Sequence, residues 1–171
     1  MSIEHIANIR PAENTDIDTI RELLRKTWLD AYGFIPVEDL DTYLNANYSV
    51  AKLKEILTTD REECFVYDDG TGITGWMRLR RDDDNNIFSV ISLYVLPEAQ
   101  GKGTGKKLLN FACEFALEYR FEKVTLGVMT QKEKSAKWYQ NNGFSIVRTE
   151  PFTMGNTEVE HLIMEKIIFF Q

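Results

Sequence analysis

The segment that most restricts the possible folds is the glycine-rich stretch Gln100–Lys107, which reads QGKGTGKK. It follows residues 87–96, a run rich in Val, Ile, Tyr and Phe that predicts a β-strand ending before Pro97. It precedes residues 105–119, where apolar side chains recur at helical spacing. Glycines let backbone amides approach a ligand, and a helix start adds free N–H groups and a positive dipole end. This order predicts an α/β fold with an anion-binding loop.

The distribution of charge favours the same interpretation. The 171 residues include 20 Lys+Arg and 27 Asp+Glu, a formal net charge of −7, yet Gln100–Lys107 holds three lysines and no carboxylate. A turn with solvated lysines is the alternative. The acidic balance argues against a nucleic-acid partner and is compatible with a cationic partner or with solubility alone.

Length and the absence of a linker or an internal repeat predict one domain over residues 1–171. Cys64 and Cys113 lie in separate hydrophobic stretches, which is typical of buried thiols. Asp82–Asp84 lacks the spacing of a calcium loop, so we expect no metal. With neither a leader pattern nor a membrane-length apolar stretch, the expected protein is cytoplasmic, without a membrane partner.

Hydrophobic periodicity divides the rest of the chain into predicted strands and helices. Strands are expected at residues 6–10, 64–67, 73–79, 87–96, 124–128, 144–148 and 158–168, and helices at 17–28, 37–44, 50–57, 105–119 and 134–142. This order predicts a mixed sheet with helices on both faces. We expect the helical insert at residues 37–57 to cover one end of the fold.

Two familiar phosphate loops fail on spacing. A Walker loop needs four residues between its first glycine and Gly-Lys, whereas Gly101 and Gly105 are separated by three, and Lys107 stands where Ser or Thr is required. A dinucleotide fingerprint has the pattern G-x-G-x-x-G and an acidic residue at the end of the next strand. Here the loop reads G-x-G-x-G, and the next strand ends at Val128-Met129.

The loop instead resembles the Q/R-x-x-G-x-G/A motif of the GNAT superfamily of acyl-CoA-dependent N-acetyltransferases, here Gln100–Gly105. Leu93–Pro97 resembles the strand before that motif, and Trp138–Phe144 resembles the later F-Y-x-x-x-G-F element. The element order is similar over nearly the whole chain. The resemblance implies an α/β fold with a mixed, mostly antiparallel central sheet of about seven strands and helices on both faces.

A narrower resemblance concerns the acceptor. Residues 126–128, Phe152–Asn156 and the segment 28–53 look like the PaiA-type spermidine/spermine acetyltransferases. This implies transfer of the acetyl group of acetyl-CoA to a small amine, with a polyamine favoured, by direct attack in a ternary complex. A protein N-terminal, lysine or amino-sugar acetyltransferase and a non-catalytic acyl-CoA sensor remain alternatives, and a homodimer is possible.

The resemblance also implies roles for individual residues. The loop amides would hold the cofactor pyrophosphate without a metal, and the end of the preceding strand would pair with pantetheine and donate an N–H to the thioester oxygen. The cofactor-binding residues would be Leu93, Tyr94, Val95, Gln100, Gly101, Lys102, Gly103, Thr104, Gly105 and Lys106.

Tyr139 occupies the position of the family's general acid, which protonates the departing thiolate; an aromatic residue that only packs is the alternative. Ser89–Ser92 carry no carboxylate where many relatives have a glutamate, so the base is unassigned, with a water chain and a carboxylate of the insert both open. The family usually has Asn, in contact with the cofactor, at the position of Glu133, so a cofactor contact by Glu133 is in doubt. His161 is a further candidate base; His5 is expected to be exposed.

An aromatic and acidic wall could select a cationic acceptor, and a solvated acidic face is the alternative. Its members would be Trp28, Asp30, Tyr32, Glu38 and Asp39.

Overall fold

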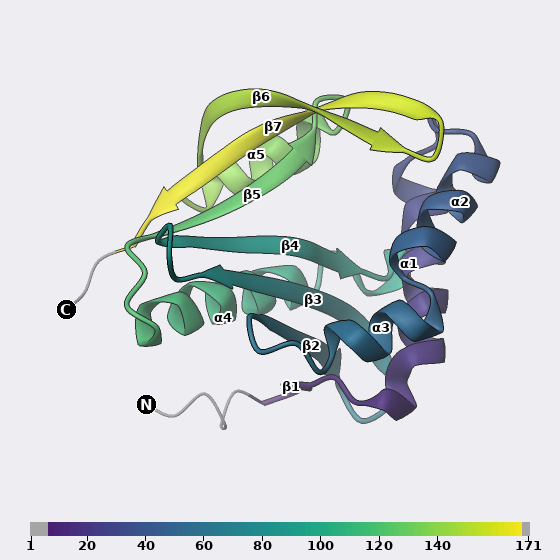
Figure 1. Cartoon of the computed structure of the whole chain (residues 1–171), viewed down its shortest axis with the longest axis horizontal. Coiled ribbons are helices and arrows are strands. Elements are labelled where there is room, and N and C mark those ends of the chain that lie inside the picture. Colours follow the sequence, from purple (N-terminus) through teal and green to yellow (C-terminus); the bar gives the residue numbers. More distant parts are fainter. Residues whose placement is uncertain (1–6, 169–171) are drawn as a thin grey trace.

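The computed structural model describes residues 7–168 and contains one seven-stranded sheet in the order β1-β2-β3-β4-β5-β7-β6 (Figure 1). The strands are β1 (Ile9–Pro11), β2 (Glu62–Asp68), β3 (Ile73–Asp82), β4 (Ile87–Val95), β5 (Lys123–Met129), β6 (Ser145–Met154) and β7 (Thr157–Ile167). The helices are α1 (Ile17–Ala31), α2 (Val37–Asn47), α3 (Val50–Ile56), α4 (Thr104–Glu118) and α5 (Glu133–Asn141), with short 3-10 turns η2 (Asn14–Asp16) and η3 (Pro97–Ala99). Only β4 and β5 pair in parallel, which confirms the mixed, mostly antiparallel sheet.

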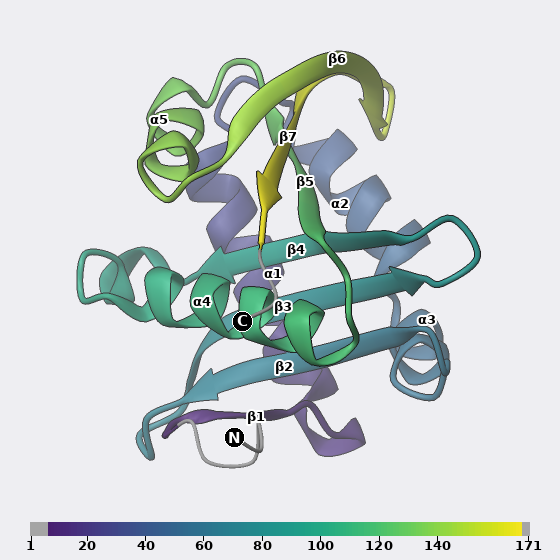
Figure 2. The same ribbon diagram turned by 90° about the vertical axis from the view of Figure 1, so that its left-hand side faces the viewer.

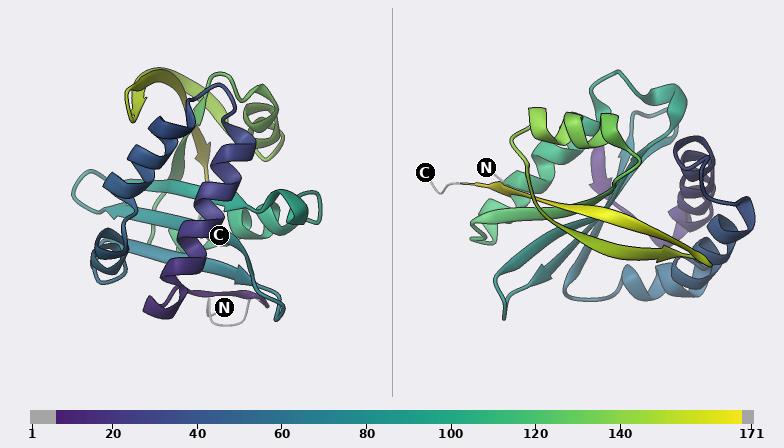
Figure 3. Two further views of the ribbon diagram at one scale, coloured as in Figure 1. Left: turned by 90° about the vertical axis from the view of Figure 1, so that its right-hand side faces the viewer. Right: turned by 90° about the horizontal axis from the view of Figure 1, so that it is seen from above.

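Helices cover both faces of the sheet, as predicted. Helix α4 lies across one face of β2–β4, whereas α1 crosses the opposite face (Figures 2 and 3). Side chains alternate accordingly, because Met77 packs in the core under α4 and Trp76 packs in the core under α1. The helical insert covers a face rather than the expected end, since α3 buries Leu53 and Ile56 in the same core as Trp76.

The sheet separates between β4 and β5. These strands pair only at Ser89 with Thr125 and at Val90 with Leu126, and they diverge toward their carboxyl ends (Figure 1). The β3–β4 ladder skips Ile91, so a bulge bends β4 where the separation begins. The described chain therefore forms two half-sheets, β1–β4 and β5–β7, joined by a short parallel contact.

A second contact links the β5–β7 half-sheet to helix α2. The tip of the β6–β7 hairpin lies against α2, where the Asp39 carboxylate accepts hydrogen bonds from the Asn156 N–H (2.9 Å) and the Thr157 hydroxyl. Residues 152–156 are thus mainly strand with a tight turn at Gly155. The predicted strand at residues 144–148 is shorter than the observed β6, which extends from Ser145 to Met154 and pairs with β7.

Other boundaries also differ from the predictions. Helix α2 continues to Asn47, through part of the expected turn, and β1 includes Pro11; Ile6 lies outside the described residues. Of the apolar C-terminal residues, Ile167 is exposed and Ile168 is buried, and the next two lie outside the described part. Within residues 7–168 no helix has the length and apolar character needed to cross a membrane.

Candidate active site

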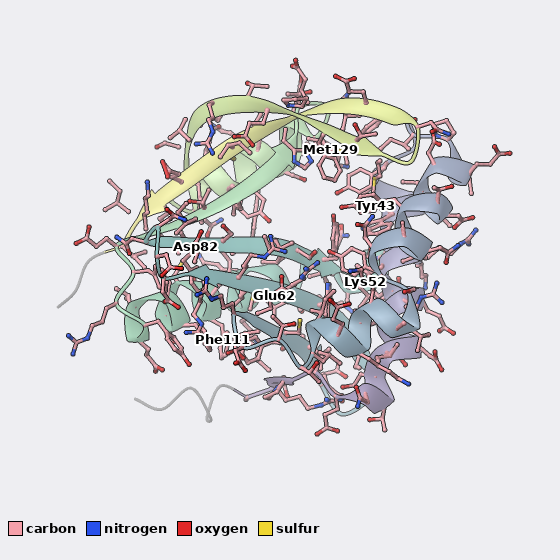
Figure 4. The ribbon with its side chains drawn as sticks, viewed as in Figure 1. Tyr43, Lys52, Glu62, Asp82, Phe111 and Met129 are labelled. Carbon is pink, nitrogen blue, oxygen red and sulfur yellow. The ribbon has the colours of Figure 1, made fainter. Side chains whose placement is uncertain are left out.

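A cavity of about 1180 Å³ occupies the space between the half-sheets. One side is lined by the glycine loop and α5, and the other by aromatic residues of α1, α2 and β6. Tyr43 on α2 and Met129 at the end of β5 both line this space (Figure 4). Because a single ligand site commonly measures about 300–1,000 Å³, the cavity has room for two substrates.

The glycine loop has the geometry of an anion site. Gly101 (φ +76°) and Gly103 (φ +85°) are in the left-handed region, and Gly103 caps the start of α4. The Gln100 side-chain amide donates to the Val95 carbonyl at 3.0 Å, which fastens the loop to the end of β4. Lys106 lines the cavity beside the loop. Backbone amides, a helix start and a lysine together fit a diphosphate.

Two residues predicted in this group would contribute only their backbone amides, because their side chains lie elsewhere. Thr104 is buried, and its methyl group lies close to Gly75 rather than to the cavity. Lys102 is exposed, and neither side chain lines the cavity. The remaining predicted residues all do: Leu93, Tyr94, Val95, Gln100, Gly101, Gly103, Gly105 and Lys106.

The end of β4 presents free backbone donors to the separation. The Leu96 N–H donates to the Thr74 carbonyl at 2.9 Å, and amides alternate in direction along a strand. The N–H groups of Leu93 and Val95 therefore point toward β5, beyond the last β4–β5 pair. The Tyr94 side chain faces the α1 side, where its hydroxyl lies 3.0 Å from that of Tyr32.

Tyr139 lies on α5 and lines the same cavity. Its ring packs edge-on against Trp138 and Phe144, at centroid distances of 4.9 and 5.7 Å. Burial, with a smaller contribution from Tyr32, raises the pKa of the Tyr139 phenol above its usual value. Its hydroxyl forms no hydrogen bond to another residue in 7–168, so a protonated donor is available to a ligand.

The predicted acceptor wall is only partly assembled. Trp28, Asp30 and Tyr32 line the cavity, and Trp28 packs edge-on against the rings of three tyrosines. Glu38 does not line it. Asp39 holds the β6–β7 hairpin instead, so its carboxylate is already occupied.

An ion cluster on the acceptor side was missing from the sequence prediction. We name Glu62 on β2 with Arg78 and Arg80 on β3 the arginine floor; all three line the cavity. The two arginines alternate with apolar residues and share the strand face of Trp76. That alternation is a signal that could have identified them, because the face is covered by the insert.

The predicted secondary candidates lie as follows. His161 lines the cavity and stacks on Phe152 (centroids 4.2 Å apart, planes 13° apart), and burial lowers the pKa of its imidazole. Glu133 is exposed at the start of α5 and does not line the cavity, whereas Lys132 and Lys134 do. His5 lies outside the described residues. Among residues 7–168, no three His, Cys, Asp or Glu side chains gather as metal ligands.

Comparison with known proteins identifies the family of this chain. Residues 17–144 match the acetyltransferase (GNAT) family. The chain is 26% identical over 156 residues to an uncharacterized N-acetyltransferase of Mycobacterium tuberculosis, covering 90% of this chain and 99% of the relative. It is also 26% identical over 156 residues to the spermidine N(1)-acetyltransferase of Thermoplasma acidophilum, covering 88% and 92%.

A solved structure has the same fold. The crystal structure of PaiA N-acetyltransferase from Thermoplasma acidophilum in complex with coenzyme A aligns with a TM-score of 0.82, at 24% identity, over 94% of this chain and 98% of that one. The class is therefore that of the N-acetyltransferase enzymes. The chain belongs to the acetyltransferase (GNAT) family, as the motifs implied.

Proposed function

We propose that this chain transfers the acetyl group of acetyl-CoA to the primary amine of a small molecule. One observation carries the proposal: a single cavity connects the glycine loop on the α4 side with the aromatic surface on the α1 side, through the separation between β4 and β5. The loop suits the cofactor diphosphate, and the aromatic side suits the acceptor. The coenzyme A complex of the Thermoplasma protein supports the first assignment.

The proposed reaction is direct. The neutral amine attacks the thioester carbonyl carbon, the C–N bond forms, and the C–S bond breaks. The N–H groups of Leu93 and Val95 are the candidate donors to the oxyanion. Tyr139 gives its proton to the thiolate and recovers one from solvent. The amine releases its protons to water or to a carboxylate; Asp30 on α1 and Glu55 on α3 line the cavity.

The cysteines support transfer without a covalent enzyme intermediate. Both Cys64 and Cys113 are buried. Burial raises the pKa of the Cys64 thiol to about 12, and it also raises that of Cys113. Because the thiolate is the nucleophilic form, neither side chain suits an acetyl-cysteine step, and a ternary complex remains the proposed mechanism.

A polyamine belongs among the acceptors of this proposal. The sequence resemblance, the name of the Thermoplasma spermidine acetyltransferase and the ring-lined acceptor side support it. Lysine, peptide N-termini and amino sugars are the alternatives within the class. The exposed carboxylate of Asp30 lies on this side of the cavity.

A thiol-release assay with acetyl-CoA tests the proposal. The panel contains spermidine, putrescine, lysine, glucosamine and a short peptide, each supplied at saturating acetyl-CoA. We expect amine-dependent release of CoA and acetylated product by mass spectrometry. Tight binding of acetyl-CoA without release across the panel would identify a sensor and refute the enzymatic proposal.

A further inference from the structure

We infer that the acceptor of this site carries a carboxylate in addition to its amine. The inference rests on the proposed acetyl transfer, and among the acceptors named above it favours lysine or a peptide over the polyamine that the resemblance suggests. It comes from the charge and the hydrogen-bonding capacity of the arginine floor, Glu62, Arg78 and Arg80.

Two guanidinium groups of this floor share one carboxylate. Arg78 donates to Glu62 at 2.8 and 3.1 Å, and Arg80 donates to the same carboxylate at 2.8 Å. The side chains of Arg78 and Glu62 are 12% and 8% exposed, whereas that of Arg80 is 48% exposed. Arg80 approaches Glu62 through Nε and Nη2, so its Nη1 donors have no partner among residues 7–168, and Arg80 lines the cavity.

The floor has one uncompensated positive charge. Burial would raise the pKa of Glu62, but hydrogen bonds from Arg78 and Arg80 outweigh it and lower that pKa, so the carboxylate is ionised at neutral pH. Asp30, Lys52 and Glu55 also line the cavity, and Lys52 and Glu55 form their own pair at 3.5 Å on α3; Glu62 and Lys52 are labelled in Figure 4. Within the floor itself, two guanidinium groups face one carboxylate. A ligand carboxylate would balance the count.

Two hydroxyls lie beside the floor. Arg78 Nη1 donates to the Tyr48 hydroxyl at 3.3 Å, and the Tyr48 and Ser92 hydroxyls lie 2.8 Å apart, where either can be the donor. Tyr48 and Ser92 both line the cavity. This surface suits a ligand with acceptor oxygens.

The floor lies near the expected reaction centre. Arg78 is paired across the sheet with Ser92, the residue before Leu93, and Arg80 lies about 10 Å along β3 from Met77, the partner of Leu93. An amine at Leu93 would therefore belong to a molecule whose carboxylate extends toward Arg80, such as an amino acid that reacts through its side-chain amine, or a short peptide. A second ammonium group at that place would meet guanidinium groups of the same charge.

Matched acceptors test this inference directly. Lysine and cadaverine differ by one carboxylate, as do ornithine and putrescine. For the wild type we expect kcat/KM to be at least tenfold higher for each amino acid than for its diamine, mainly through KM. Arg80→Gln should reduce that ratio about tenfold, by raising KM for the amino acids and lowering it for the diamines.

A matched control is Arg61→Gln, because Arg61 pairs with Asp84 at 3.3 Å on the exposed surface and does not line the cavity. It should leave the ratio unchanged. Unaltered melting temperature and affinity for CoA would show that Arg80→Gln remains folded. Better turnover of the diamines by the wild type, or a ratio unaffected by Arg80→Gln, would overturn the inference.

Calorimetric binding of the four acceptors to the CoA-saturated protein separates this inference from the proposed function. Selective binding of the amino acids, lost in Arg80→Gln, would support the carboxylate subsite even if no thiol were released. Absence of thiol release would then contradict only the acetyl-transfer proposal. Equal or stronger binding of the diamines would overturn the inference whatever the activity.

Discussion

Tyr139 is a half-buried residue that packs against Trp138 and Phe144 and lines the cavity. We predict that Tyr139→Phe lowers kcat by about 10²-fold, the usual contribution of a general acid, while the Kd for acetyl-CoA changes less than twofold. The phenyl ring keeps the contacts to Trp138 and Phe144, so folding should be preserved. Steady-state kinetics and calorimetry check the two parts. Unchanged turnover would remove Tyr139 from the chemistry.

For single residues, the sequence does not predict the environment of a side chain where consecutive residues point in different directions. Glu38 and Asp39 are consecutive, and both are candidates for the acceptor wall, with a solvated acidic face as the alternative. Successive residues of a helix point about 100° apart, so on α2 Glu38 is exposed and Asp39 is buried against the hairpin. The sequence contains no local signal for the bond between Asp39 and Asn156, since 117 residues separate them.

The contact between α2 and the β6–β7 hairpin depends on a glycine. Gly155 has φ +61°, and a Cβ there would lie 2.6–2.7 Å from Asp39 backbone and Cβ atoms. We predict that Gly155→Ala destabilises the fold by about 1–3 kcal/mol and raises KM for the acceptor, with little effect on CoA affinity. Chemical denaturation measures the first effect.

Gly70→Ala is the matched control for that variant. Gly70 also has a positive φ, +91°, but nothing lies within 4 Å of its Cβ position. It should show the cost of the backbone conformation alone. If both variants lose the same stability, close packing of the hairpin on α2 contributes nothing.

The same contact predicts a pH dependence. Hydrogen bonds from Thr157 and Asn156 lower the pKa of Asp39 below its unfolded value near 3.9. A carboxyl with a depressed folded pKa stabilises the fold above the unfolded pKa, and this stabilisation is lost as the pH falls through the folded pKa. Relative to Asp39→Asn, the wild type should therefore be more stable at pH 7, with a difference that shrinks below about pH 4.

Thermal melting of both proteins from pH 7 to pH 2.5 measures this difference. Asp84→Asn serves as the control, because Asp84 lies on the exposed surface. A difference between wild type and Asp39→Asn that is constant with pH would exclude a contribution from ionised Asp39.

For the whole molecule, the fold class was predictable because its signals are local. The glycine loop, α4 and the motif around Tyr139 each occupy a continuous stretch, and the structure brings these stretches to one cavity. The arginine floor depends on strand register, which pairs Glu62 with Arg80. Register and hairpin docking arise from packing between distant segments, so periodicity alone could not predict them.

Cofactor binding should stabilise the whole molecule, because a ligand that binds only the folded chain shifts the folding equilibrium toward it. At a CoA concentration about 100 times Kd the expected gain is about 2.7 kcal/mol, seen as a higher melting temperature. Gly103→Val should remove most of this shift, since Gly103 has a positive φ at the loop.

Gly33→Val is the control for the loop variant, because nothing lies within 4 Å of its Cβ position and its φ is not positive. EDTA should leave both the CoA shift and thiol release unchanged if the diphosphate is held by amides and lysine alone. A CoA-dependent shift that survives in Gly103→Val, or that requires a metal, would contradict this loop assignment.

The separation between β4 and β5 has a consequence for the order of events. Because each proposed substrate lies on its own side of the sheet, neither has to pass the other to reach the reaction centre. The product CoA can then remain bound while a new amine binds, which forms a dead-end complex of CoA, amine and enzyme. Turnover would accordingly decline at high amine concentration, and a higher acetyl-CoA concentration would restore it by competing with CoA.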